Sequence, residues 1–296
     1  MLPKQKKLPP TMLTAAKYKI PLLCFVLILA AMFAVLLPLA SAEASNRQNV
    51  QESLDKISGA VNAAEPVYQR LRKIISEEIS AMGVEGETDS DIAESEAGYE
   101  ELNGYTKQLD SLISGLSGLP GNPDSSDGKT VNAAREYLSM LRNMTADLAE
   151  LVRYSIDMYY AVEPIGTVDG ETEDFGVLAE QIWNGCELTR AMMEEVKPPS
   201  YMAITHGDMI ARVTEFRDFG QDFYTACYME DPLRIYSCIY RMNRIIRMFD
   251  ICSENLDADM NLQLKQAERR LNGPVTQLRD ELTKNLETLK NAQGRD

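Results

Sequence analysis

Apolar residues recur at alternating intervals of three and four along most of residues 45–292. The pattern is clearest in residues 45–82, where it begins with Val50, Leu54, Ile57 and Val61. This spacing places apolar side chains on one face of an α-helix and is typical of the heptad seam of helices that pack together. No stretch sustains the two-residue alternation of a strand. The sequence therefore predicts an all-α protein, an antiparallel helical bundle with long, coiled-coil-like helices.

One hydrophobic N-terminal helix is expected to precede the bundle. Residues 1–19 form a basic region with five lysines and no acid, and residues 20–42 carry no charge. This order places the N-terminus in the cytoplasm. A helix over residues 20–40 would measure roughly 31 Å, enough to cross a bilayer.

The end of this segment leaves two outcomes open. Ala40 and Ala42 flank a serine in a sequence typical of signal-peptidase sites. The segment is therefore either a transmembrane anchor or a signal peptide. In the first case the chain is a single-pass membrane protein with its N-terminus inside and its C-terminus outside. In the second it is secreted after cleavage near Ala42. Both outcomes make the remaining chain extracytoplasmic.

The rest of the chain divides by composition and periodicity. We expect a long amphipathic helix over 45–82, an acidic linker over 83–98, a weak helix and a Gly/Pro/Ser-rich loop over 99–130, a helical bundle core over 131–256, and a C-terminal amphipathic helix over 257–292 that is broken at Gly273 and Pro274. Asp231 followed by Pro232 marks a helix start inside the core. The first and last helices are of similar length, so they either pair as a stalk or pack into one larger bundle.

Charge and composition exclude several functions. The chain has 45 acidic and 30 basic residues, and removing the five N-terminal lysines from its net charge of -15 leaves -20 on residues 43–296. Phosphate backbones repel such a surface, so no nucleic-acid partner is expected. A single histidine excludes sites that need two imidazoles from one chain. No nucleophile elbow or phosphate-binding loop is present, and we expect neither a cofactor, a metal, nor an enzymatic activity.

Four cysteines follow the hydrophobic segment, namely Cys186, Cys227, Cys238 and Cys252. An even number in an oxidising compartment suggests disulfides. If the helices are antiparallel hairpins, a rise of 1.5 Å per residue brings Cys186 within roughly 4 Å in height of Cys252, and Cys227 within roughly 6 to 9 Å of Cys238. Because all four also lie on the apolar seams, the alternative is that they are free core thiols.

The sequence favours binding over catalysis. The leading hypothesis is a non-enzymatic binding or scaffolding protein of the cell envelope that meets a protein partner, or another copy of itself, through its helical seams. The N-terminal helix would also hold it to the membrane if it is not cleaved. The alternative is a ligand-binding, sensor-like bundle that acts through a partner membrane protein. Its expected pocket is lined by Tyr159, Trp183, His206, Phe216 and Phe223.

Overall fold

The computed structural model describes residues 49–76, 89–119, 125–168, 170, 172 and 174–293. The chain divides into two compact units, Met1–Lys56 and Ile57–Asp296. In the first unit the described residues, 49–56, are helical. The predicted basic region, the hydrophobic segment over 20–42 and the candidate cleavage site at Ala40 and Ala42 lie outside the described residues.

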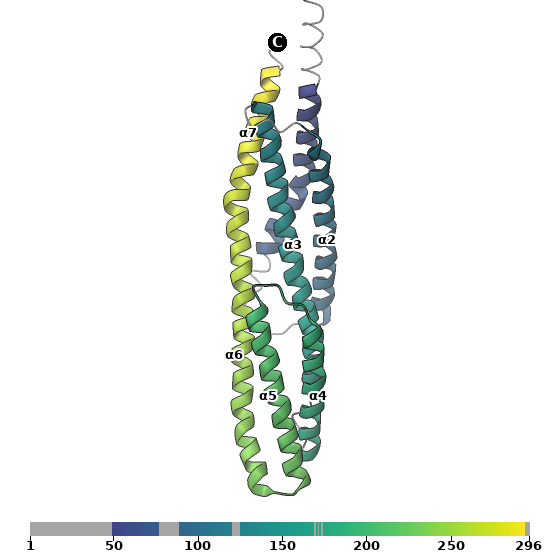
Figure 1. Cartoon of the computed structure of the whole chain (residues 1–296), viewed down its shortest axis with the longest axis vertical. Helices are drawn as coiled ribbons and strands as arrows, with labels where there is room; N and C mark the ends of the chain where they lie inside the picture. The colour runs from purple at the N-terminus through teal and green to yellow at the C-terminus, as the bar shows by residue number, and fades with distance from the viewer. Residues whose placement is uncertain are drawn as a thin grey trace, which may run out of the picture. The chain divides into compact units, whose positions relative to one another are not determined.

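Every regular element of the described residues is a helix, which confirms the all-α prediction. The second unit begins with a helix over residues 57–76. It is followed by α2 (Asp89–Ser117), α3 (Ser126–Gly166), α4 (Phe175–Glu195), α5 (Ala203–Tyr228), α6 (Pro232–Arg270), a π-helical turn η1 (Leu271–Val275) and α7 (Thr276–Gln293). Figure 1 shows α4, α5 and α6 as neighbouring helices of the second unit.

The predicted helix start at Asp231 and Pro232 is confirmed. The Asp231 carboxylate accepts hydrogen bonds from the backbone N–H groups of Leu233 and Arg234, and Pro232 takes the first position of α6, where its missing N–H costs nothing. The preceding residue, Glu230, has a left-handed backbone with φ of 51° that closes the turn from α5. The α5–α6 hairpin is therefore tight.

Two local expectations were wrong. Residues 89–98, expected to belong to the acidic linker, form the first turns of α2. Ile92 is buried there, and the exposed Glu94 is tolerated because glutamate is a good helix former. The expected break at Pro274 is a π-helical turn, in which the Thr276 hydroxyl donates to the Leu271 carbonyl. This wider turn accommodates the missing proline N–H, so helical structure continues from α6 into α7.

The helix of 57–76, α2, the first half of α3, and α7 form one antiparallel group. Arg70 pairs with Glu101 of α2, and Arg142 of α3 pairs with Asp110 of α2. One hydrogen bond also joins Lys290 to Ser58, 232 residues apart, with the Lys290 ammonium as the donor. The first and last helices thus lie side by side, with α2 and α3 packed beside them.

A half-buried cation, Arg279, strengthens the pairing of the first and last helices. The Arg279 guanidinium donates to both carboxylate oxygens of Glu65 at 2.8 and 2.9 Å and lies 4.8 Å from the centre of the Tyr68 ring. Burial raises the pKa of Glu65, but the hydrogen bonds from Arg279 and Gln69 outweigh it, so the pKa of this carboxyl is lowered. The carboxylate is therefore held in its charged form.

The second half of α3, together with α4, α5 and the first half of α6, encloses a second apolar core. Its buried members include Tyr154, Met158, Ile182, Cys186, Met193, Met209, Phe219, Phe223, Ile245 and Cys252. Glycines let the backbones approach closely within it: a Cβ placed on Gly220 of α5 would lie 2.7 Å from the Trp183 nitrogen of α4. The long helices α3 and α6 thus each run from one group of helices into the other.

Candidate functional site

The five aromatic and histidine positions expected to line one pocket lie apart in the second core. His206 and Phe223 are buried, whereas Tyr159, Trp183 and Phe216 are half-buried. His206 and Phe223 are both on α5 but 17 residues apart, which is roughly 25 Å along the helix. The Trp183 ring packs against Tyr224, with ring centres 6.0 Å apart. The structure therefore does not bring the five side chains into one pocket.

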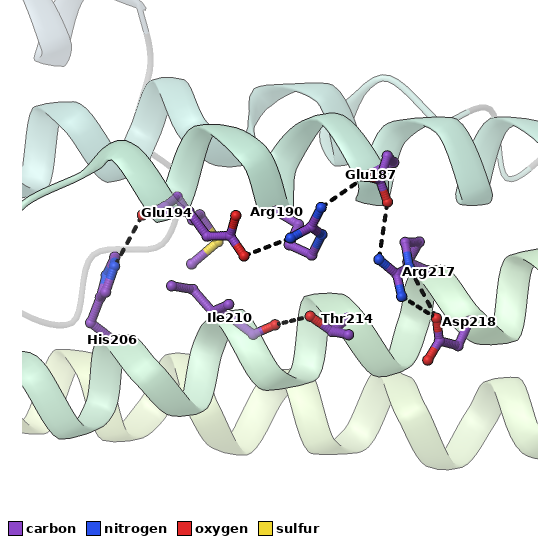
Figure 2. Close-up of polar contacts among 9 residues, drawn as sticks. Glu187, Arg190, Glu194, His206, Ile210, Thr214, Arg217 and Asp218 are labelled. Atoms are coloured by element: carbon purple, nitrogen blue, oxygen red, sulfur yellow. Dashed lines mark hydrogen bonds and ion pairs between the residues drawn. The ribbon is translucent and has the colours of Figure 1, made fainter.

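His206 is a hydrogen-bonded core residue. Its Nε2 lies 3.1 Å from the Met193 carbonyl oxygen, and its Nδ1 lies 3.1 Å from the Tyr154 hydroxyl (Figure 2 shows the first contact). Because a carbonyl only accepts, Nε2 carries the proton and Nδ1 accepts from Tyr154. Burial lowers the pKa of His206, although the carbonyl partly opposes this shift. The imidazole is neutral, with both nitrogens engaged.

No group of three or more His, Cys, Asp or Glu side chains among the described residues is arranged to hold a metal ion. The four cysteines carry free thiols in the structure. Burial raises the pKa of Cys186 to about 12, and burial also raises the pKa of Cys227 and Cys238. These thiols are therefore poor nucleophiles at neutral pH. The disulfide pairing of Cys186 with Cys252 and of Cys227 with Cys238 stays a prediction.

Charged side chains between α4 and α5 form a ladder of ion pairs (Figure 2). Arg190 donates to Glu187 at 2.9 Å and to Glu194 at 2.6 Å, and Arg217 of α5 reaches across to Glu187 at 3.1 Å. Hydrogen bonding from Arg190 lowers the pKa of Glu187. A carboxyl with a lowered pKa is deprotonated at neutral pH and has no proton to donate as a general acid, so this ladder fits a structural role.

A shallow groove of about 310 Å³ lies where α2, α3 and the segment after α4 meet. It is lined by Tyr99, Asn103, Thr106, Ala146, Ala149, Glu150, Arg153, Tyr154 and Lys197. The Arg153 guanidinium lies 5.7 Å from the centre of the Tyr99 ring. Sequence reasoning missed this groove because its residues come from three distant segments without a shared motif.

The side of α6 that faces away from the core carries large apolar side chains. We define the outer face of α6 as Leu233, Tyr236, Tyr240, Arg244, Arg247 and Ile251. The side chains of Leu233, Tyr236 and Tyr240 are 86%, 79% and 83% exposed, and Ile251 is 48% exposed. At 100° per residue, Tyr240 lies about 200° around the helix axis from the buried Cys238. The outer face is thus opposite the buried seam.

The outer face is also locally basic. Residues 232–251 contain four arginines and one aspartate, within a chain whose net charge is -15. Arg241 pairs with Asp222 of α5 at 3.0 Å. Within the described part of the chain, Arg244 and Arg247 form no ion pair. The residues of the outer face are also spaced by three and four in the sequence. The apolar seam that is buried on the same helix has the same spacing and more apolar residues, so the sequence pointed to that seam first.

None of the helices in the described residues is long and apolar enough to cross a membrane. Comparison of the chain with protein-family models, with curated proteins and with solved structures gave no significant match.

Proposed function

We propose that this chain is a non-enzymatic helical-bundle protein for binding or scaffolding at the cell envelope, and that the outer face of α6 is its binding surface. The observation that carries the proposal is the exposure of Leu233, Tyr236 and Tyr240 on a helix whose opposite side is already buried. Apolar patches of this kind on a folded protein are typical of interaction sites.

The chemistry of the outer face supports binding. Tyrosine and arginine are among the residues most enriched at the positions that dominate binding energy at protein interfaces. Tyr236 and Tyr240 lie one helical turn apart, and Arg244 and Arg247 follow them without an acidic partner among the described residues. A helix face with these side chains offers apolar area and unpaired hydrogen-bond donors to a second surface.

The envelope location is supported by the N-terminal sequence. Five lysines precede the uncharged segment 20–42, and the chain after it is strongly acidic. This order favours export of the bundle, either anchored by the segment or released after Ala42. Binding at the outer surface of a membrane would then be the task of the exported bundle.

The state of the reactive side chains supports a non-enzymatic role. The single histidine has both ring nitrogens engaged, and burial raises the pKa of the Cys186 thiol. The Glu187 carboxylate is paired with two arginines. Each of these groups has a structural partner or environment that makes it less suited to acid, base or nucleophilic chemistry.

The test is photo-crosslinking in cells that express the full chain. A photoreactive amino acid replaces Tyr236 on the outer face or, as a matched control, the exposed Glu268 further along the same helix. We expect covalent adducts from position 236 and none from position 268. Equal labelling, or no adduct at position 236, would contradict the proposal.

The groove supports a second candidate function, the binding of a small ligand by a sensor-like bundle that acts through a partner membrane protein. Lys197 lies on its wall with the Tyr99 ring and the Asn103 amide, and the lining also contains one acid, Glu150, and Arg153, which pairs with Asp157. This lining suits a small carboxylate with an apolar body. A thermal-shift screen of aromatic and aliphatic carboxylates tests it, with Lys197→Ala as the variant that should lose any stabilisation.

A further inference from the structure

The outer face of α6 is complementary to the same face of a second, antiparallel α6. Leu233, Tyr236 and Tyr240 form its first half, and Arg244, Arg247 and Ile251 form its second half. If two copies of α6 lie antiparallel about residue 242, each residue of the first half meets one of the second half. These side chains point away from their own bundle and are free to contact a second copy.

The heights along the two helices agree with this pairing. At 1.5 Å per residue, Leu233 and Tyr240 of one copy come level with Ile251 and Arg244 of the other, and Tyr236 comes within about 1.5 Å of the level of Arg247. Leucine would then pack against isoleucine, and each tyrosine ring would face a guanidinium. Arginine over a tyrosine ring is a favourable cation–π arrangement.

From this match we infer that a second copy of this chain covers the outer face of α6, in an antiparallel helix pair related by two-fold symmetry. The inference rests on the proposed function and names the partner of the same surface. An interface between identical surfaces must be complementary to itself, and here the apolar and the cation–aromatic pairs both satisfy that condition.

The size of the surface fits a pair of copies. With Tyr236 and Tyr240 at 79% and 83% exposure and Leu233 at 86%, the face offers on the order of 500 Å² on each copy. Two copies together reach the roughly 1,000 Å² expected of a specific interface.

Charge argues against an anionic membrane as the occupant. The outer face has only two arginines outside ion pairs among the described residues. Each basic residue near an anionic membrane contributes only about 1 kcal/mol, so two of them attract such a surface weakly. A second copy uses the same arginines against tyrosine rings and needs no anionic lipid.

The photoreactive residue at position 236 also identifies the occupant. We expect an adduct of twice the mass of the chain as it occurs in the cell, in which the tryptic peptide that contains position 236 is joined to a peptide within residues 245–265 of the second copy. Joining to the second copy's own residues 235–241 would overturn the antiparallel arrangement. Adducts with other proteins alone would overturn the second copy as occupant but leave the proposed binding function standing. No adduct would overturn both.

A charge exchange tests the register independently. Tyr236→Arg places two arginines opposite each other and should raise the dissociation constant of the pair about 100-fold, because symmetry applies each substitution twice. Adding Arg247→Tyr to that variant restores an arginine opposite a tyrosine and should recover most of the affinity. Because both side chains are exposed, unchanged circular dichroism melting is expected for both variants. Failure of the second substitution to restore association would overturn the register.

Discussion

Gly220→Ala should destabilise the second core by distorting the contact between α4 and α5. A Cβ at this position would lie 2.7 Å from the Trp183 backbone nitrogen and 2.9 Å from its Cα. Ordinary carbon contacts are about 3.5 to 4.0 Å, so the two helices must separate by roughly 1 Å. The obstruction is backbone of a packed helix, which cannot rotate away as a flexible side chain would.

Two opposing terms set the magnitude. Alanine is favoured over glycine inside a helix by about 1 kcal/mol. Overpacking a tight core costs about 1–3 kcal/mol, and a backbone clash belongs at the upper end of that range. We therefore expect a net loss of about 1–2 kcal/mol in the free energy of unfolding. For a chain of this size, the melting temperature should fall by about 2–8 °C.

Gly207→Ala is the matched control. Gly207 lies on the same helix, is exposed, and a Cβ there would meet nothing within 4 Å. Only the helix preference remains, so this variant should gain about 0.5–1 kcal/mol. Thermal unfolding followed by far-ultraviolet circular dichroism compares the two variants with the parent chain. If Gly220→Ala is as stable as Gly207→Ala, the close approach of α4 and α5 is wrong.

Three further predictions concern buried polar groups. Tyr137→Phe should leave the free energy of unfolding unchanged or raise it by about 1 kcal/mol, because the buried Tyr137 hydroxyl has no hydrogen-bond partner in the structure. Tyr154→Phe should lower it by about 1–2 kcal/mol, because His206 Nδ1 then has no donor. Chemical denaturation measures both changes. The pKa of His206 in the folded protein lies below its ordinary value of 6.5, so the unfolded chain takes up a proton first as the pH falls. The parent chain should therefore lose stability as the pH falls from about 7.5 to 5.5. Thermal melts across that range should show a smaller loss for His206→Gln. In the native protein, a maleimide should label the half-buried Cys227 well before Cys186, as measured by peptide mass; equal rates would contradict the packing around Cys186.

The sequence predicted helices well where apolar periodicity and capping chemistry agreed. Asp231 and Pro232 supply both a side-chain cap and a proline that needs no partner, and α6 begins there. Local composition misled at residues 89–98, because acids that suit a solvated linker also suit the first turns of a helix. At Pro274 the expected break was replaced by a π-helical turn, since Thr276 bonds five residues back.

The candidate site was harder to predict because it depends on which helix faces remain uncovered. The spacing of Leu233, Tyr236 and Tyr240 is compatible with either a buried or an exposed stripe, and only the positions of α4 and α5 decide which stripe of α6 is buried. The expected aromatic pocket failed for the same reason. His206 and Phe223 share an apolar seam, but they lie too far apart along α5 to contact one ligand.

The most direct test of the binding surface is the mass of the full chain at equilibrium. Sedimentation equilibrium in a detergent matched to the density of the solvent gives the protein mass across a range of concentrations. We predict twice the single-chain mass, which is 33.1 kDa when the N-terminal segment is retained, for the parent chain and the single-chain mass for Tyr236→Arg. The single-chain mass for both, at every concentration, would contradict the pairing of two copies through the outer face of α6.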